Sequence, residues 1–439
     1  MRENSYLAQP VLLSEPRGGV PDIIDTKRAF NRMIEAFASA SGPIAADAER
    51  ASGYRYGHKD RLVQFKREGA GIALIDPVAL ESQRIDWNDF NEVAGDAVWI
   101  IHDAMQDLPG FAELGLCPKK LFDTEFASRL LGMKRNGLSF VTEHYLGMTL
   151  AKEHSAADWS YRPLGRDMRN YAALDVEVLE QVMEKMNEDI ISSGKSGWAE
   201  EEFDYILKKG LQGRKEYAEP WRRVSKITVL GKDRRGLAVV RELWTERDKY
   251  AREYDISPSL LLSDSAIIEA AVKKPRNAKQ FSSVRSLNTR VRIRTDDGRE
   301  KMFERYAPIQ RKIKPRVWKE AIQRALALPE SSLPLSSPRG SKSEYAPGEE
   351  PAPKSVKYWR ENWPDRYEKL EKARQITAQI SQDTHTPADI LLKPAILRNL
   401  CWNYKFVSDA NDVRDRLFRG GARAWQTELL SESLTRVIM

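Results

Sequence analysis

The spacing of hydrophobic residues changes from a helical to a strand-like pattern near residue 44. Residues 27–40 (KRAFNRMIEAFASA) repeat their apolar positions every three or four residues, which predicts an amphipathic helix. Short apolar runs that are typical of strands occur at 44–48, 61–65, 71–76 and 97–102. Helical patterns return at 124–132 and 166–190. Strands followed by strands that alternate with helices predict an α/β domain with a mixed sheet and flanking helices.

Strand patterns fade after about residue 200, and helical patterns occupy most of the remaining chain. They are clearest at 236–252, 264–273, 316–328 and 360–437. Residues 329–357 are rich in Pro, Ser, Gly and charged residues without any amphipathic period, which predicts a flexible linker. The predicted organisation is an N-terminal tail (1–24), the α/β domain (25–195), an all-α domain (205–328), the linker (329–357) and a second all-α domain (358–437).

The two helical regions share a local pattern. LWTERDKYAREYDISPSLLLSDSAI in the middle of the chain and RYEKLEKARQITAQISQDTHTPADILLKPAIL near its end each give a charged amphipathic helix. A polar turn, a proline (Pro258 and Pro387) and an Ile/Leu run follow in both. This predicts that a small helical domain has been duplicated, although two unrelated helical hairpins can resemble each other by chance.

Positive charge is concentrated in the middle of the chain. The formal net charge is only +7, but residues 205–235 carry ten basic and three acidic residues, and residues 285–325 carry thirteen and five. Such clusters can bind a phosphate backbone. Taken alone, each cluster is explained equally well as a solvated helical surface.

The cysteine count and the lack of long apolar runs indicate a cellular compartment. Cys117 and Cys401 are far apart and form no CxxC motif, which fits a reducing environment and excludes a thiolate zinc site. No apolar run approaches the ~18–20 residues of a membrane helix, and the N-terminus lacks the order of a secretory signal. We therefore expect a cytoplasmic protein without membrane association.

Four acidic residues stand where strands end or helices begin. Asp47 and Glu49, two residues apart, share one face of a predicted strand. Asp107 falls in the opening turn of the helix after the strand at 97–102, and Asp175 lies four residues after Tyr171 on one helical face. Carboxylates that converge in this way suit Mg²⁺, and two such ions ~3.5–4 Å apart can support phosphodiester hydrolysis. One isolated acid is more often a cap or a solvated surface residue, so the combination carries the prediction.

Residues of about 25–190 resemble the exonuclease domain of the ribonuclease D family, in its tyrosine-containing DEDD variant. ADAER, IIHDAMQDL and YAALD resemble its three motifs, and LFDTEFASRLLG and KEHSAADWSYRPL resemble two further conserved segments. The resemblance implies a ribonuclease H-like fold and two divalent ions, Mg²⁺ or Mn²⁺. It implies that Asp47, Glu49, Asp107 and Asp175 bind the ions and that Tyr171 completes the catalytic set.

Several residues depart from this family pattern or imitate it. Arg50 follows motif I where the family usually has an aromatic residue, and it could contact a phosphate; Asp103 follows His102 where a small or amide residue is common. Asp123 and Glu125 also spell Asp-x-Glu, but they follow motif II, so we interpret Asp123 as the N-cap of a helix. His102 could orient the site or serve as a buried structural residue.

The middle helical block resembles the HRDC domain (helicase and RNase D C-terminal), which helps to hold nucleic acid in that family, and the last block resembles a more diverged copy. Apolar residues of the middle block are expected to form its core. The basic residues are the candidate nucleic-acid contacts, and together with Arg50 they are Arg222, Arg223, Lys226, Arg290, Arg292 and Arg294. Trp221 could stack on unpaired bases or pack between domains.

The function that the resemblance implies is trimming of the 3′ ends of structured RNA, such as tRNA precursors, with release of nucleoside monophosphates. A 3′-5′ exonuclease acting on single-stranded DNA is the alternative, because no residue can be tied to a 2′-hydroxyl. A nucleic-acid-binding protein with an inactive nuclease domain ranks lower, because all four acids and Tyr171 are present. The expected partner is RNA with a free 3′ end, and the sequence identifies no protein partner.

Overall fold

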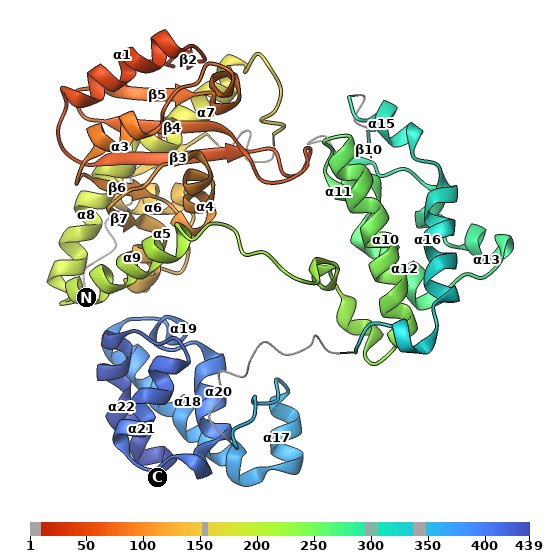
Figure 1. The fold of residues 1–439 in the computed structure, drawn as a ribbon. Coiled ribbons are helices and arrows are strands. Elements are labelled where there is room, and N and C mark those ends of the chain that lie inside the picture. The colour runs from red at the N-terminus through yellow and green to blue at the C-terminus, as the bar shows by residue number, and fades with distance from the viewer. Residues whose placement is uncertain (1–9, 152–156, 295–299, 302–304, 337–347) are drawn as a thin grey trace.

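A six-stranded mixed sheet in the order β2-β5-β4-β3-β6-β7 forms the centre of the N-terminal domain (Figure 1). Its strands are β2 (Ile23–Ile24), β3 (Ile44–Arg50), β4 (Asp60–Arg67), β5 (Gly71–Ile75), β6 (Val98–Ile101) and β7 (Lys120–Asp123). β4 pairs antiparallel with β3 and β5, whereas the β2–β5, β3–β6 and β6–β7 pairs are parallel. This confirms the predicted mixed sheet. The short strand β2 comes from the stretch that the sequence assigns to a tail, so the domain begins before residue 25.

The computed structural model describes residues 10–151, 157–294, 300–301, 305–336 and 348–439. Helices surround the sheet of the N-terminal domain. The helices of the domain are α1 (Lys27–Ala38), α2 (Pro77–Glu81), α3 (Asn88–Ala94), α4 (Ala104–Leu114), α5 (Thr124–Leu130), α6 (Leu138–Leu146), α7 (Arg166–Glu177), α8 (Leu179–Ser192) and α9 (Ser196–Gly210). A separate parallel pair joins β1 (Val11–Leu13) to β8 (Met148–Leu150). The helix predicted at 166–190 is two helices, α7 and α8, which meet at Val178.

The two faces of the sheet pack against different helices. Phe65 on one face of β4 stacks on α3, whereas Leu62 on the other face packs with Ala172 of α7. Glu49 lies directly opposite Leu62 in the β3–β4 ladder, and paired residues project to the same face. Glu49 and Asp47, two residues earlier, therefore face α7, the helix that carries the third motif.

The middle domain is a helical bundle, as predicted. Its elements are η1 (Pro220–Arg223), η2 (Ile227–Leu230), α10 (Arg234–Glu253), α11 (Pro258–Leu261), α12 (Asp264–Lys273), α13 (Ala278–Ser283), α14 (Arg285–Asn288), the hairpin β9 (Ile293–Arg294) and β10 (Glu300–Lys301), α15 (Ala307–Lys312) and α16 (Pro315–Ala327). α10 packs against α12 and α16, and Leu243 on α10 is fully buried. Trp221 is also buried in this core, so it packs within the bundle and is not available to stack on bases.

The C-terminal domain is a second helical bundle. It contains α17 (Val356–Asn362), α18 (Pro364–Thr384), α19 (Ala388–Leu391), α20 (Pro394–Trp402), η4 (Tyr404–Phe406), α21 (Ala410–Arg419) and α22 (Ala424–Ile438). α18 packs against α20 and α22. Within the described ranges, no helix of the chain is both long and apolar enough to cross a membrane.

The two helical domains share a local geometry. In each, a long helix (α10 or α18) is followed by a residue with positive φ, a four-residue helix (α11 or α19) and a further helix (α12 or α20). A buried glutamine amide donates to the first carbonyl of the Ile/Leu run in both, from Gln310 to Leu260 and from Gln426 to Ile390, each at 2.7 Å. These parallels support a duplicated domain, and the duplication stays a prediction.

The linker predicted at 329–357 is ordered at both of its ends. η3 (Glu330–Ser332) and the buried Leu333 pack on the middle domain, where Arg234 donates to the Pro334 carbonyl at 3.0 Å. At the other end, Glu349 pairs with Arg416 of the C-terminal domain. The prediction of a flexible linker is therefore wrong for these flanking residues, and its central part, 337–347, lies outside the described residues.

The middle domain contacts the N-terminal domain beside the end of β3. Tyr56, in the loop 51–59 between β3 and β4, donates its hydroxyl to Asp248 of α10 at 3.0 Å. Tyr306 of the middle domain donates its hydroxyl to Asp158, in the turn that precedes α7, at 2.7 Å. The middle domain is thus connected to the loop that follows β3 and to the turn before the N-terminal end of α7.

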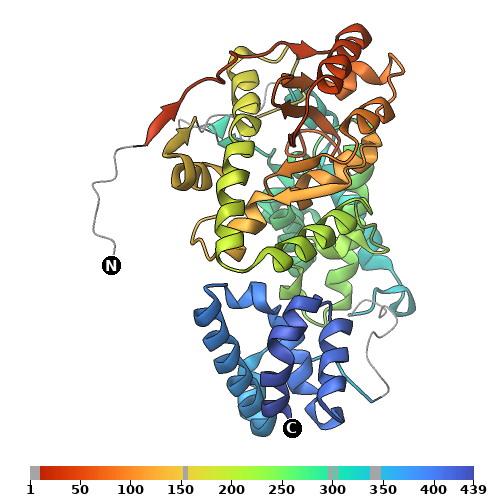
Figure 2. The same cartoon turned by 90° about the vertical axis from the view of Figure 1, so that its left-hand side faces the viewer.

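The C-terminal domain docks at another place, the helix α9 (Figures 1 and 2). Glu202 on α9 is almost fully buried and accepts from Arg423 at 2.9 Å and from the indole of Trp425 at 3.1 Å. Trp425 also stacks on Trp198, with ring centroids 4.6 Å apart. A buried ion pair that is fully hydrogen-bonded leaves a costly unpaired charge when one partner is removed.

We predict that Arg423→Ala lowers the free energy of unfolding by about 3–5 kcal/mol, because it strands the buried Glu202 carboxylate. Urea denaturation followed by tryptophan fluorescence measures this. Arg436→Ala is the matched control, because Arg436 pairs with Glu432 on an exposed helix surface and is expected to change stability by at most about 0.5 kcal/mol. Equal effects of the two substitutions would contradict the role of this interface.

Candidate active site

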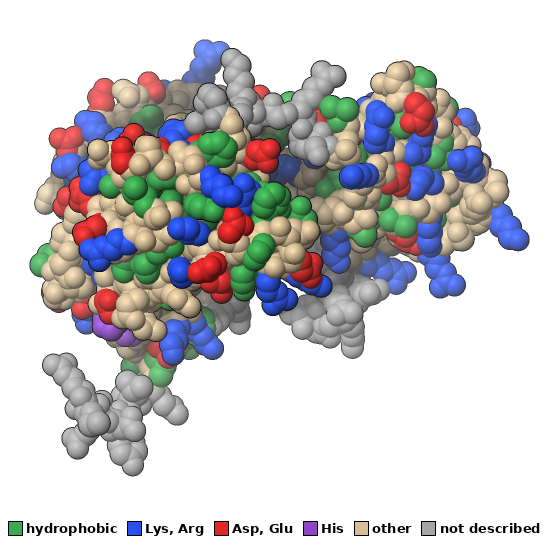
Figure 3. All heavy atoms as spheres, turned by 90° about the horizontal axis from the view of Figure 1, so that it is seen from below, with side chains coloured by type: hydrophobic (Ala, Val, Ile, Leu, Met, Phe, Trp, Pro, Cys, Tyr) green, Lys and Arg blue, Asp and Glu red, His purple; other side chains and the backbone are tan. Residues whose placement is uncertain are grey.

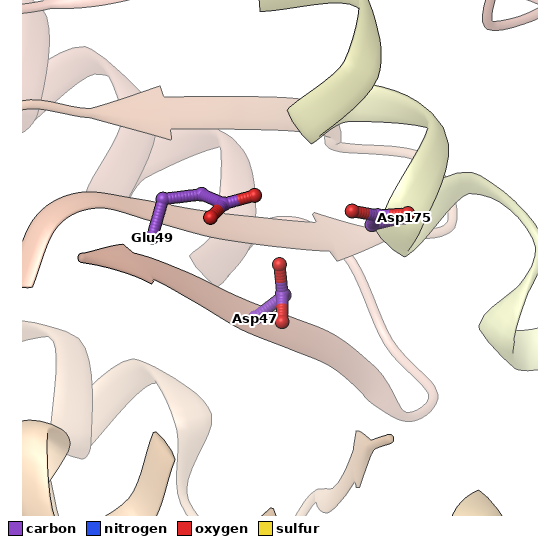
Figure 4. Close-up of side chains that lie close together, drawn as sticks. All are labelled: Asp47, Glu49 and Asp175. Carbon is purple, nitrogen blue, oxygen red and sulfur yellow. The ribbon is translucent and has the colours of Figure 1, made fainter. Parts of the chain in front are cut away.

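Asp47, Glu49 and Asp175 meet where β3 lies against α7. Asp47 and Glu49 project from β3 toward α7, and Asp175 projects from α7 toward them (Figure 4). One carboxylate oxygen of each lies within 4.8 Å of the others. The sequence-based expectation that these three carboxylates converge is therefore confirmed as geometry. Tyr171, one helical turn before Asp175, donates its hydroxyl to the Asp175 carboxylate.

Asp107 joins the cluster from the first turn of α4, as predicted, but an arginine holds its carboxylate. Arg50 Nη2 lies 2.9 Å from Asp107 Oδ1, and Arg50 Nη1 lies 3.3 Å from Oδ1 of Asp60 on β4. Asp107 remains close enough to Asp47 for a hydrogen bond between the two carboxyl groups. The pattern at 44–50 identified Arg50 as a departure from the family but gave no sign of Asp60, whose role depends on the pairing of β3 with β4.

Burial raises the pKa values of all four carboxyl groups, and repulsion between carboxylates adds to this for three of them. For Asp47, Glu49, Asp107 and Asp175, burial is the largest cause, because it disfavours the charged form. Neighbouring carboxylates raise the pKa values of Glu49, Asp107 and Asp175 further. The guanidinium of Arg50 acts in the opposite direction on Asp47 and Asp107. A nearby positive charge therefore favours the charged forms of these groups.

The donor set fits a divalent cation. Carboxylate oxygens are the hard ligands that Mg²⁺ and Mn²⁺ take in proteins, and three of them are already within reach of one point. A bound cation would offset the repulsion that raises the pKa values of these groups. The residues present are thus suited to hold a metal ion.

The acidic cluster lies on the wall of a cavity of about 900 Å³. Besides the acids and Tyr171, the cavity is lined by Tyr54 of the β3–β4 loop, by His102 after β6 and by Glu125 of α5. Burial and the nearby Asp123 carboxylate raise the pKa of Glu125 to about 7. Glu125 was not expected at this site, because the sequence identifies it only as part of a helix start.

Asp123 caps helix α5, and His102 contacts Thr124 at the start of that helix. Asp123 accepts hydrogen bonds from the backbone N–H groups of Glu125 and Phe126 at the start of α5, which makes it the N-cap, as interpreted from the sequence. It also accepts from Ala104 at the start of α4. His102 Nδ1 lies 2.9 Å from the Thr124 hydroxyl, and burial lowers the pKa of His102 to about 4. Asp123 thereby fixes the start of α4, the helix that presents Asp107.

The predicted nucleic-acid contacts lie in different environments. Arg223, Lys226, Arg290 and Arg292 are exposed on the middle domain, and Lys and Arg side chains are frequent on that lobe (Figure 3). Arg222 instead pairs with Glu219 and covers Trp221, and the side chain of Arg294 lies outside the described residues. Arg50 is held by two carboxylates rather than exposed for a phosphate. The roles of all these residues as contacts stay predictions.

Three segments match known protein families. Residues 21–191 match the family described as 3′-5′ exonuclease, and residues 236–295 match the HRDC domain. Residues 352–438 match a different family, which is described as the 3′ to 5′ exonuclease C-terminal domain. The middle domain is thus confirmed as HRDC-like, whereas the last domain, which the sequence predicts to be a diverged HRDC copy, matches a family of its own.

Similar proteins support the same assignment. Ribonuclease D of Bartonella henselae is 31% identical over 221 residues, which are 49% of this chain and 52% of that protein. Ribonuclease D of Escherichia coli is 27% identical over 278 residues, which are 62% of this chain and 71% of that protein. The chain spans about half the length of the first curated relatives that it matches.

Solved structures extend the similarity to nearly the whole chain. A protein from Bifidobacterium adolescentis is 58% identical, covers 98% of this chain over 99% of its own, and has a TM-score of 0.87. The Escherichia coli RNase D structure covers 95% of this chain over 98% of its own at 22% identity with a TM-score of 0.60, which shows a shared fold. The order of the three domains is therefore common to these proteins.

We predict that the metal-free protein loses stability as the pH rises. The four carboxyl groups have folded-state pKa values above those of the unfolded chain, so the folded state binds more protons, and stability is lost as the pH rises through the folded-state values. In EDTA the Tm should fall from about pH 5 to about pH 8. Added Mn²⁺ should restore more stability at the higher pH.

A substitution separates this effect from general pH sensitivity. Asp175→Asn removes one of the repelling charges and is expected to raise the Tm in EDTA at about pH 8. Each kcal/mol by which the free energy of unfolding increases should raise the Tm by about 2–4 °C. Asp167→Asn on the same helix is the control, because this exposed residue lies in the first turn of α7, where a negative charge is favourable. A lower Tm for both variants would contradict the prediction.

Proposed function

We propose that this chain, which is similar to ribonuclease D and has a 3′-5′ exonuclease domain and an HRDC domain, is a metal-dependent exoribonuclease. Its substrates would be structured RNAs with a free 3′ end, such as tRNA precursors, and its products nucleoside monophosphates. The observation that carries the proposal is the convergence of the Asp47, Glu49 and Asp175 carboxylates in a large cavity. The Escherichia coli relative is described as an exoribonuclease involved in structured RNA processing.

The four acids are the proposed ligands of two divalent ions, Mg²⁺ or Mn²⁺. Asp47, Glu49 and Asp175 already lie together, and Asp107 borders them from α4. When bound, the ions supply the positive charge that makes a water nucleophilic and stabilises the leaving oxygen of a phosphodiester. The protein's own contribution is to keep the carboxylates fixed at the junction of β3, α4 and α7, so that little reorganisation is needed during the reaction.

Tyr171 is the proposed positioning group for the attacking water. Its hydroxyl donates to Asp175, and burial together with the charges of Asp175 and Glu49 raises its pKa well above the ordinary value. The phenol therefore stays protonated at neutral pH. A protonated hydroxyl anchored to Asp175 can hold a water at a fixed position beside the acidic cluster.

The exposed basic residues of the middle domain are the proposed contacts for the RNA backbone. Arg223, Lys226, Arg290 and Arg292 lie on the domain that contacts the N-terminal domain beside the cavity. Contacts to phosphate provide affinity without reading sequence. An enzyme built in this way recognises the free 3′ end and the shape of the RNA rather than a particular base.

The decisive experiment is digestion at single-nucleotide resolution. A 5′-labelled tRNA with a 3′ extension and a DNA strand of the same sequence are incubated with the full-length protein in Mg²⁺, in EDTA and as the Asp175→Asn variant. Stepwise shortening of the RNA, lost in EDTA and reduced at least about 10³-fold in the variant, is expected. Shortening of the DNA alone would move the function to DNA, and binding without cleavage of either strand would leave a binding protein.

A second prediction concerns Tyr171. Tyr171→Phe removes the hydroxyl that positions water and is expected to lower kcat about 10- to 100-fold while leaving KM for RNA and Mn²⁺ affinity nearly unchanged. Tyr145→Phe is a matched control, because the Tyr145 hydroxyl donates to Asp189 at 3.0 Å away from this cavity. Equal losses in both variants, or weaker Mn²⁺ binding in Tyr171→Phe, would contradict a water-positioning role.

A further inference from the structure

Arg50 lies within the acidic cluster, and its guanidinium bridges two carboxylates. It contacts Asp107 at 2.9 Å and Asp60 at 3.3 Å, and only 17% of its side chain is exposed. A register shift in the β3–β4 ladder between Glu49 and Arg50 interrupts the regular alternation at this point. Arg50 pairs with Asp60 across that irregularity, which places the guanidinium on the same side as Asp107 instead of in solvent.

Asp60 is built into the fold as an anchor for Arg50. Its side chain is fully buried on β4, and its Oδ2 has no hydrogen-bond partner among the described residues, so Arg50 is its principal counter-charge. A Cβ atom at Gly110 would lie 2.2 Å from that Oδ2, which means that only glycine leaves room for the carboxylate. Gly110 lies on α4, three residues after Asp107. The same helix therefore carries Asp107 and leaves the space that the Asp60 carboxylate occupies.

The arginine and a second cation require the same carboxylate. Arg50 already uses Asp107 Oδ1, whereas Asp47, Glu49 and Asp175 bring an oxygen each to one point. A guanidinium keeps its charge at every relevant pH, so it cannot give way to a metal ion by losing a proton. It can only move aside, and Asp60 offers a second carboxylate that retains it when it leaves Asp107.

We propose that Arg50 is a resident cation that competes with the second divalent ion for Asp107. The protein without substrate then binds one divalent ion tightly, at Asp47, Glu49 and Asp175, and a second ion only when Arg50 moves onto Asp60 alone. This inference rests on the proposed function, because it assumes that the acidic cluster binds divalent ions. It assigns Arg50 a positioning role through Asp107 rather than a contact with the RNA.

The test is an equilibrium titration of the full-length protein with Mn²⁺, in which electron paramagnetic resonance measures the free ion. The wild type is expected to bind one ion tightly and a second at least about tenfold more weakly. Arg50→Gln removes the competing charge and should strengthen the second site at least about tenfold. Arg55→Gln is the matched control, because Arg55 lies in the next loop and pairs with Asp255 outside the cluster, so it should behave like the wild type.

Two further measurements keep the outcomes distinct. Arg50→Gln leaves Asp60 buried without its counter-charge, so this variant could fail to fold. The double variant Arg50→Gln with Asp60→Asn removes both charges and should show the same stronger binding of the second Mn²⁺ ion. The Mg²⁺ concentration for half-maximal RNA hydrolysis should fall in parallel with the stronger second site.

Each remaining outcome overturns a specific statement. Unchanged Mn²⁺ binding in both the Arg50→Gln and the double variant, or two equally tight ions in the wild type, would overturn the competition. Unchanged Mn²⁺ binding with a raised KM for RNA would identify Arg50 as a phosphate contact instead. If Mn²⁺ binds nowhere, or binds equally to Asp175→Asn, the proposed function fails, and the role of Arg50 fails with it.

Discussion

The convergence of four carboxylates is the constraint on which the functional part of this structure depends. Asp47, Glu49, Asp107 and Asp175 lie close together on the wall of a cavity, and their limited exposure raises the pKa of each of them. The fold maintains it because the strand and helices that carry these groups are held by an extensive core. Carboxylates that are held together in this way favour a cation between them.

Three neighbouring side chains position these carboxylates or offset their charge. Asp123 fixes the start of α4 and hence the position of Asp107, and Tyr171 donates a hydrogen bond to Asp175. Arg50 supplies the one positive side chain that contacts Asp107 in the described part of the chain. The site thus combines fixed carboxylates with a permanent internal cation.

The helical domains differ in how they relate to this site. The HRDC-like domain contacts the loop that follows β3, the strand of Glu49, and the turn that precedes α7, the helix of Asp175. The C-terminal domain docks on α9 through the buried Glu202–Arg423 pair. The two helical domains therefore contact different parts of the exonuclease domain, the first at the loop after β3 and the turn before α7, and the second at α9.

The sequence by itself determined the elements whose signals are local. The spacing of Asp47 and Glu49 placed both on one strand face, the four-residue spacing of Tyr171 and Asp175 placed both on one helical face, and the Pro- and Ser-rich stretch marked the boundary between the helical domains. Periodicity and spacing carry this information because neighbouring residues of a strand or helix have fixed relative directions. Strand β2 was missed because its two residues show no period, and β7 because Leu121 and Phe122 are its only apolar residues, whereas β6, which is equally long, is apolar throughout.

Only the tertiary structure decided which distant residues meet. The pairing of Arg50 with Asp60 follows from the register of β3 against β4, and the need for glycine at position 110 appears only once α4 packs beside that pair. Trp221 turned out to be core, because its surroundings come from helices far along the chain. Contacts of this kind depend on how whole elements pack, and no local spacing in the sequence encodes them.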